Sequence, residues 1–107
     1  MKTIRRLDDL EGIEKDAPVV VTMNIRTGQG NIRTDNIGIF YQRRKQSFSV
    51  IGPLITNIGP PIAKMTYEWD AQLNTFILGE SGFPFRERSK EYQKYEALLT
   101  QNFGEAA

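Results

Sequence analysis

The sequence contains no cysteine and no histidine among its 107 residues. Without cysteine the chain has no disulfide, no thiol nucleophile and no thiolate ligand for a metal. Without histidine it lacks the side chain that most often acts as a general acid or base near neutral pH, and the commonest metal ligand. We therefore expect a protein that is not an enzyme and that holds no cofactor and no metal.

Long apolar runs are also missing. No stretch approaches the ~18 apolar residues that a membrane-spanning helix requires. The first residues, MKTIRRLDDLEGIEKDAP, carry charges every few positions. They lack the apolar region of a signal peptide. We expect a cytoplasmic protein that makes no contact with a membrane.

A large excess of charge of one sign is absent too. The chain has 14 Lys and Arg residues against 13 Asp and Glu residues, a net charge of +1. Strong basicity, which would make nucleic-acid binding the leading hypothesis, is therefore missing. The apolar content of 39% and the length of 107 residues are typical of one globular domain.

What the sequence does contain, from Pro18 onward, is alternation of apolar and polar residues. In PVVVTMNIRT every second residue is apolar, the pattern of a half-buried strand. Four more runs follow: NIRTDNIGIFYQ, QSFSVI, PIAKMTYEWD and LNTFILG. Gly38 is expected to mark a bulge or bend in the second strand. Five strands with short connections predict an antiparallel meander, strongly twisted or curled.

The segment NIRTGQGNIRT, residues 24–34, joins the first two of these strands. Placing the apolar rows of both strands on one face pairs Val21 with Ile37 and leaves residues 28–30 as the loop. Gly30 suits the last loop position, where φ is positive. A phosphate-binding loop is disfavoured, because a strand pattern and not a helix follows the glycines.

The segment SKEYQKYEALLTQNF, residues 89–103, has the pattern of an amphipathic helix. Ser89 fits the N-cap and Gly104 a C-terminal stop. The apolar positions follow at helical spacing: Tyr92, Tyr95, Leu99 and Phe103. We expect this helix to pack on one face of the sheet, and a short helix to form within residues 4–15. The predicted fold class is α+β, with a small closed β-barrel as the alternative.

Apolar residues on the other face of the sheet are the first functional candidates. By alternation Phe40 and Phe76 point away from the face that the helix covers. An apolar cluster on an otherwise polar face often marks a partner site. Alternatively, the N-terminal apolar residues fold over the cluster or the sheet closes into a barrel. The sequence leaves both readings open.

The connection IGPLITNIGPP, residues 51–61, is unusually apolar for a loop. It carries Leu54, Ile55 and Ile58 between Gly-Pro pairs. These residues either pack against the edge of the core or insert into a groove of a partner, at low entropic cost because the prolines stiffen the loop.

Basic residues gather at the tips of two consecutive hairpins. Arg26 and Arg33 flank the first tip, and Arg43, Arg44 and Lys45 form the second, beside Tyr41. Consecutive hairpins of a meander point in opposite directions, so the two groups are expected to lie roughly 30 Å apart. The second group with Tyr41 is a candidate for binding nucleic acid.

Together these patterns predict a small protein-binding module that acts stoichiometrically, as an inhibitor, an adaptor or an assembly protein. Its partner is an unidentified protein, and a homodimer through the second sheet face is a related alternative. Nucleic-acid binding through the basic tips is the other hypothesis. An enzyme that uses Glu68 and Asp70, two residues apart on one strand, is a third.

Overall fold

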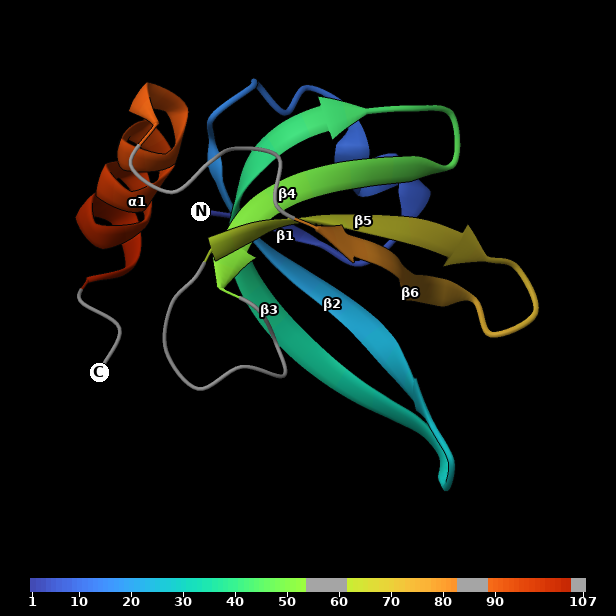
Figure 1. Ribbon diagram of the computed structural model, residues 1–107. Helices are drawn as coiled ribbons and strands as arrows, with labels where there is room; N and C mark the ends of the chain where they lie inside the picture. Colours follow the sequence, from blue (N-terminus) through green and yellow to red (C-terminus); the bar gives the residue numbers. More distant parts are fainter. Residues whose placement is uncertain (54–61, 83–88, 105–107) are drawn as a thin grey trace.

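The computed structural model describes residues 1–53, 62–82 and 89–104, with the backbone alone at Arg26, Ser81 and Gly82 (Figure 1). In chain order the elements are β1 (Lys2–Ile4), the 3-10 helix η1 (Leu7–Leu10), β2 (Pro18–Thr27), β3 (Gly30–Arg43), β4 (Ser47–Pro53), β5 (Ile62–Asp70), β6 (Thr75–Gly82) and α1 (Lys90–Phe103). The predicted α+β class, with an antiparallel meander followed by a C-terminal helix, is confirmed.

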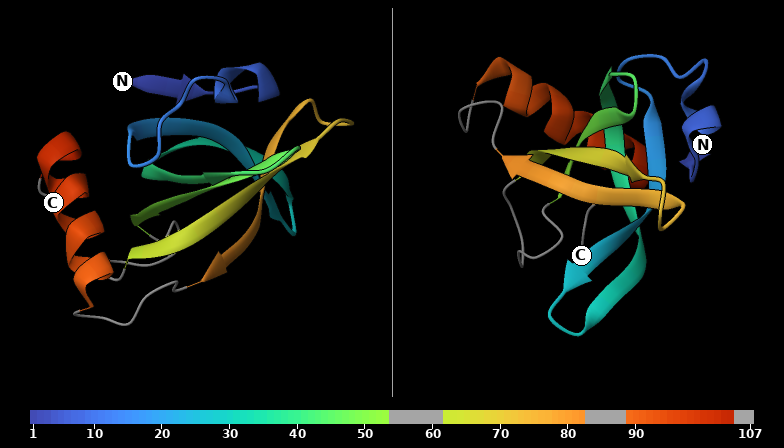
Figure 2. Two further views of the ribbon diagram at one scale, coloured as in Figure 1. Left: turned by 90° about the horizontal axis from the view of Figure 1, so that it is seen from above. Right: turned by 90° about the vertical axis from the view of Figure 1, so that its right-hand side faces the viewer.

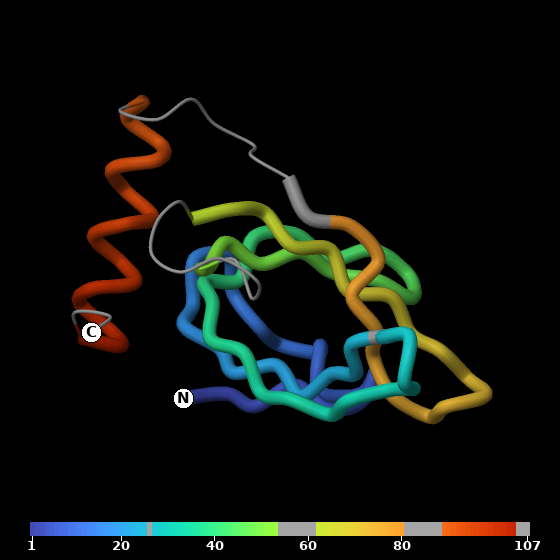
Figure 3. Tube along the Cα trace, turned by 60° about the horizontal axis from the view of Figure 1, so that its bottom comes forward, coloured from blue at the N-terminus to red at the C-terminus, as the bar shows by residue number. Residues whose placement is uncertain are grey.

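The five strands β2 to β6 curl into a barrel-like sheet (Figure 3). Each strand is antiparallel to the next, and β6 closes the ring by pairing in parallel with β2 at Met23 and Asn24. The short β1 pairs in parallel with β2 from Val19 to Val21. Because β3 occupies the other edge of β2, β1 and β6 share one edge. The sheet thus closes as the barrel alternative predicted.

The register between β2 and β3 corrects the predicted hairpin. Val21 pairs with Asn36 instead of Ile37, and Thr27 pairs with Gly30, so only Gly28 and Gln29 form the turn. Gly30 has the expected positive φ, 120°. The prediction failed because it placed the isoleucines of β3 on the same face as Val21. A shift of one residue moves a whole strand's side chains to the opposite face.

Two glycines let β3 and β4 approach closely where the sheet curls. A Cβ on Gly52 would lie 2.6 Å from the carbonyl oxygen of Ile37, and a Cβ on Gly38 would lie 2.9 Å from the Cβ of Val50. The bulge predicted at Gly38 is displaced, because the register shifts between Phe40 and Gln42 instead. Gly38 therefore serves close packing of the two strands.

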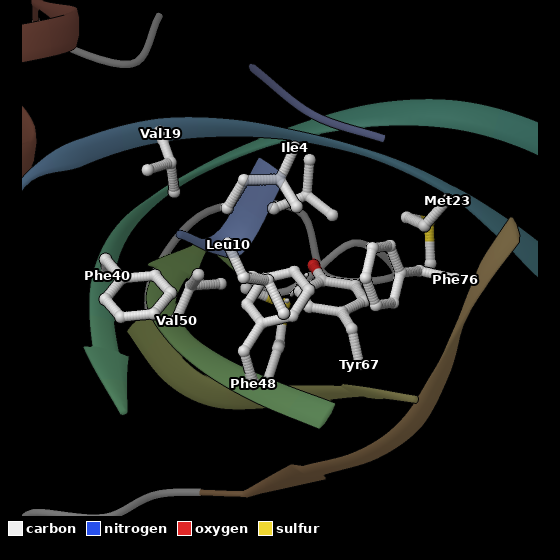
Figure 4. Packing of buried hydrophobic residues seen from close by; sticks show 11 residues of the cluster. Ile4, Leu10, Val19, Met23, Phe40, Phe48, Val50, Tyr67 and Phe76 are labelled. Atoms are coloured by element: carbon white, nitrogen blue, oxygen red, sulfur yellow. Dashed lines mark hydrogen bonds between the residues drawn. The ribbon is translucent and has the colours of Figure 1, made fainter. Parts of the chain in front are cut away.

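The barrel interior is filled by apolar side chains from every strand and from η1 (Figure 4). Phe48 lies at its centre, with ring centroids 4.9 Å from Phe76 and 5.3 Å from Tyr67. The fully buried Tyr67 hydroxyl accepts a hydrogen bond from Nδ2 of Asn36 (2.9 Å). Burial raises the pKa of Tyr67 to about 12, so the hydroxyl stays protonated in the core.

A second apolar cluster lies outside the barrel, where α1 packs beside one end of the strands (Figure 2). Ile39 and Ile51 meet Tyr95 and Leu99 there. As predicted, Ser89 caps the helix, with its Oγ accepting from the backbone N–H of Tyr92 (3.1 Å), and Gly104 ends it with a φ of 78°. The predicted packing of the helix on the sheet is confirmed.

Asp16, just before β2, fastens this helix to the barrel. Its carboxylate accepts from Nζ of Lys94 (2.7 Å) and from the hydroxyl of Tyr95 (2.8 Å). Desolvation raises the pKa of Asp16, but the bonds from Lys94 and Tyr95 outweigh it and hold that pKa below its ordinary value. The carboxylate therefore docks the helix in its charged form.

The N-terminal helix predicted within residues 4–15 forms only as the short η1. Residues 2–4 are extended as β1 instead. Ile4 and Leu10 are fully buried in the barrel interior. The segment gains more by placing these two side chains in the core than by forming a surface helix, because burying each is worth about 1.5–3 kcal/mol.

Candidate functional site: the hairpin arm and an arginine-lined cleft

Phe40 and Phe76, predicted to bind a partner, are buried in the barrel interior. Their side chains are 4% and 0% exposed. The second face of the predicted sheet is the inside of the closed barrel, and Ile4 and Leu10 pack against the same cluster. The prediction of an exposed patch at Phe40 and Phe76 is therefore wrong, and a homodimer through this face has no surface to use.

The three apolar loop residues predicted to touch a partner, Leu54, Ile55 and Ile58, lie outside the described residues. Their role stays a prediction.

The outer part of the β2–β3 hairpin extends beyond the barrel as a two-stranded arm, residues Ile25–Ile32 (Figure 1). On the edge of β2 the pairing with β6 ends at Asn24. The tip is held by Thr27, whose Oγ1 donates to the carbonyl oxygen of Gly30 (2.6 Å) and accepts from the backbone N–H of Gln29 (3.2 Å). Past Asn24 the two strands of the arm pair with each other alone within the described structure.

One face of the arm carries the apolar row of the barrel interior out into solvent. Ile25 and Ile32 are direct cross-strand partners. Ile25 is half-buried against the core cluster, whereas Ile32 is 57% exposed. The opposite face carries Asn31 in the arm and, at the foot of the arm, the cross-strand pair of Arg33 and Asn24. Arg33 is exposed, as the sequence predicted for this tip.

The arm also continues a free strand edge. No described strand other than β2 lies beside β3 from Gly30 to Asn36, because β4 packs closely against Ile37 and Gly38 and pairs with β3 from Ile39 onward. A free edge presents backbone N–H and C=O groups in the spacing that another strand needs. The arm therefore offers an apolar row and a row of backbone hydrogen-bonding groups at once.

A polar cleft of about 340 Å³ lies at the foot of the arm. It forms where the edge of β2 changes neighbours, since β1 ends opposite Val21 and β6 begins to pair at Met23. Three arginines enter it from two directions, Arg5 and Arg6 after β1 and Arg33 from β3. The other described lining residues come from β2, from the β5–β6 turn and from the start of β6: Thr22, Asn24, Leu73, Asn74 and Thr75.

The walls of this cleft are held in place by side-chain hydrogen bonds. Oδ2 of Asp9 accepts from the backbone N–H groups of Arg5 (2.9 Å) and Arg6 (3.1 Å). The hydrogen bond from Arg5 has the largest effect on the pKa of Asp9, and together with the bond from Arg6 it holds that pKa below its ordinary value. Across the cleft, Oδ1 of Asp70 accepts from the backbone N–H groups of Gln72 (2.9 Å) and Leu73 (3.0 Å). Both loops are thus fixed by carboxylates.

The second basic tip lies at the opposite end of the barrel from the arm (Figure 1), as predicted. Arg43, Arg44 and Lys45 are exposed. Tyr41 does not join them, because its half-buried ring packs edge-on against Tyr95 (5.9 Å between centroids). The Tyr41 ring is also contacted by Nζ of Lys15 (5.2 Å from the centroid) and of Lys64 (5.9 Å), so its neighbours are Tyr95 and these two lysines.

Trp69, and not Tyr41 as predicted, is the aromatic residue that lies beside the basic tip. Arg44, Lys45 and Trp69 line an open cleft of about 500 Å³, together with Glu68. On the core side, the rings of Trp69 and Phe76 pack in a T-shaped arrangement, with 5.0 Å between their centroids. The half-buried indole and the two cations therefore share one surface.

Glu68 and Asp70, the two carboxylates of the enzyme hypothesis, have different surroundings in the structure. Asp70 holds the β5–β6 turn as described above, and Glu68 lies in the cleft beside Arg44 and Lys45. Within residues 1–53, 62–82 and 89–104 no group of three or more acidic residues could hold a metal ion. Over the same ranges no helix has the length and apolar character to cross a membrane.

Comparison with models of protein families, with curated proteins and with solved structures gives no match for this chain.

Sequence patterns missed Arg5 and Arg6, which were assigned to a helix. A strand of three residues, Lys2–Ile4, is too short to show alternation. Only the parallel pairing of β1 with β2 brings these arginines to Arg33. The available signal was the pair of adjacent arginines directly after Ile4, which does not indicate a partner strand.

Proposed function

We propose that this protein is a non-enzymatic module that binds another protein stoichiometrically through the β2–β3 arm, as an inhibitor, an adaptor or an assembly protein. The observation that carries the proposal is the free edge of β3 from Gly30 to Asn36 beside the exposed Ile32. The cytoplasm is the proposed location, since a chain without cysteine has none of the disulfides typical of small secreted domains.

The proposal rests on the low stability of a two-stranded arm that no other described strand supports. A two-stranded hairpin is at best marginally stable by itself in water, and a free edge invites aggregation. A strand from a partner that pairs with β3 would satisfy the backbone groups of the edge and continue the sheet. Its side chains would cover Ile32 on one face and meet Arg33 on the other. In that complex β3 would have a paired strand on both sides along the arm.

Quantitative affinity purification from the cells that make the protein tests this proposal. The wild-type protein and the Ile32→Asp variant serve as baits, because a carboxylate at position 32 would be buried unpaired in the complex. Thr100→Asp, on the exposed side of α1, is the matched control with the same added charge. We expect a partner that is enriched by wild type and by Thr100→Asp but reduced tenfold or more by Ile32→Asp.

Recovery of the same proteins in the same amounts by all three baits would contradict binding through the arm. Light scattering on the purified protein distinguishes a second copy from a different partner. A dimer mass that becomes a monomer mass in Ile32→Asp would identify another copy of this chain as the occupant of the arm.

A second candidate function, nucleic-acid binding, is favoured by the cleft that Trp69 shares with Arg44 and Lys45. Aromatic stacking with flanking cations is the usual way to hold single strands. Trp69 is the single tryptophan of the sequence, so its fluorescence reports directly on this cleft. Quenching by a single-stranded oligonucleotide that weakens with salt and with Arg44→Ala would support this function. Unchanged fluorescence would reject it.

A further inference from the structure

The cleft at the foot of the arm concentrates positive charge that the fold leaves unpaired. No ion pair of Arg5, Arg6 or Arg33 is present within the described residues. All three side chains are exposed, so none is needed to fill the core. Three guanidinium groups that converge from separate segments repel one another, and an anion between them would remove that repulsion.

We propose that this cleft binds the phosphate group of a small polar molecule. Guanidinium groups bind phosphate through paired, parallel hydrogen bonds, which give both geometry and strength. The cleft supplies three of these groups together with hydroxyl and amide groups from Asn24, Asn74 and Thr75. This inference does not depend on the proposed binding of a protein by the arm.

The unpaired guanidinium groups favour a dianion over a carboxylate. Three acidic residues are near the cleft, and each accepts hydrogen bonds from groups of the protein. Asp9 accepts from the backbone of Arg5 and Arg6, Asp70 from the backbone of Gln72 and Leu73, and Oδ1 of Asp35 from Oγ1 of Thr22 (2.7 Å). None of these carboxylates forms an ion pair with the three arginines within the described residues, so all three guanidinium groups remain for a ligand. A phosphate monoester, with a charge of about −1.5 to −2 near neutral pH and three acceptor oxygens, matches this set better than a single carboxylate.

The size and the walls of the cleft indicate what carries the phosphate. A volume of about 340 Å³ is at the small end of the range of ligand sites, and it leaves room for a short carbon skeleton beside the phosphate. The walls are formed by hydroxyl, amide and guanidinium groups with Leu73, and none of the described residues that line the cleft is aromatic. A nucleobase would find no ring on which to stack. The occupant of best fit is a hydroxylated phosphomonoester, such as a sugar phosphate.

Titration followed by amide chemical shifts tests this inference with inorganic phosphate, glucose 6-phosphate and unmodified glucose as probes. We expect both phosphates, and not glucose, to shift the amides around Arg5, Thr22 and Arg33. In Arg33→Gln the affinity for both phosphates should fall at least tenfold. Arg43→Gln, which removes an exposed arginine at the other end of the barrel, is the control and should leave the affinity unchanged.

Three outcomes would overturn the inference. The first is the absence of localised shifts at ~10 mM phosphate, a concentration at which even weak sites fill. The second is an equal loss of affinity in Arg33→Gln and Arg43→Gln, which would show diffuse attraction of anions. The third is binding of a single-stranded oligonucleotide at this cleft more tightly than of either phosphate, which would assign the arginines to nucleic acid. Unchanged thermal unfolding of both variants excludes misfolding as the cause.

Discussion

The two halves of the β2–β3 hairpin share one sequence pattern but lie in different environments. In the inner half Val19, Val21 and Met23 are fully buried, between β3 and the strands β1 and β6. In the arm the same alternation continues, yet Ile32 is 57% exposed. The difference arises where β1 and β6 stop pairing with β2. The burial of a side chain therefore depends on whether the neighbouring strands extend as far as its position. Apolar residues beyond the ends of those strands are exposed to solvent.

The largest effect should come from an interior residue that closes the barrel. Phe76→Ala removes a ring that packs against Phe48 and Trp69, and it should lower the free energy of unfolding by about 3–5 kcal/mol. Chemical denaturation measures this loss. The matched truncation in the arm, Ile32→Ala, should cost less than about 0.5 kcal/mol. Equal losses at the two positions would contradict the distinction between barrel and arm.

A smaller effect is expected where the sheet curls. Gly52→Ala places a Cβ about 2.6 Å from the carbonyl oxygen of Ile37, which is backbone and cannot rotate away. Separating β3 from β4 should cost about 1–3 kcal/mol. Gly28→Ala in the turn of the arm meets no atom within 4 Å and should leave the free energy of unfolding nearly unchanged. Thermal unfolding of the two variants compares them, and a drop of equal size in Gly28→Ala would mean that the arm is as tightly packed as the barrel.

Asp16, at the inner end of β2, should make stability depend on pH in the acid range. Its folded-state pKa lies below the ordinary value of 3.8, so its contribution is complete above that value and disappears as the pH falls through the lower folded pKa. Because Lys94 is half exposed, we expect the contribution to be under about 1 kcal/mol.

Asp16→Asn isolates this effect, since asparagine tolerates the φ of 70° at this position. Urea denaturation between neutral pH and about pH 2 should give the variant a shallower loss of stability than wild type. Asp9 contributes with the same sign in both proteins. Identical pH profiles would show that Asp16 does not fasten α1 through its charge.

The smallest effect on stability should be that of Ile32→Asp. Its side chain lies mostly in solvent opposite the half-buried Ile25, so the free energy of unfolding should change by no more than about 0.5 kcal/mol. Differential scanning calorimetry measures this change. A loss above 2 kcal/mol would mean that Ile32 belongs to the folding core, and the arm would then be no separate surface.

The sequence allowed the period-two strands and the capped helix at residues 89–103 to be predicted, because each depends on local patterns. The faces of β3 could not be assigned in this way. Ile39 packs under α1 while Phe40 fills the barrel, so apolar residues lie on both sides of the strand and alternation cannot decide which faces inward. The exposed Arg33 was predicted, whereas its convergence with Arg5 and Arg6 depends on the pairing of β1.

Site-specific crosslinking tests most directly whether the arm is the binding surface. Because the chain has no cysteine, Ile32→Cys and Thr100→Cys each give one position for a thiol-linked photocrosslinker. We expect irradiation in cell extract to yield a discrete crosslinked protein from position 32 and none from position 100. A product of the same mass and amount from both positions, or none from position 32, would contradict binding through the arm.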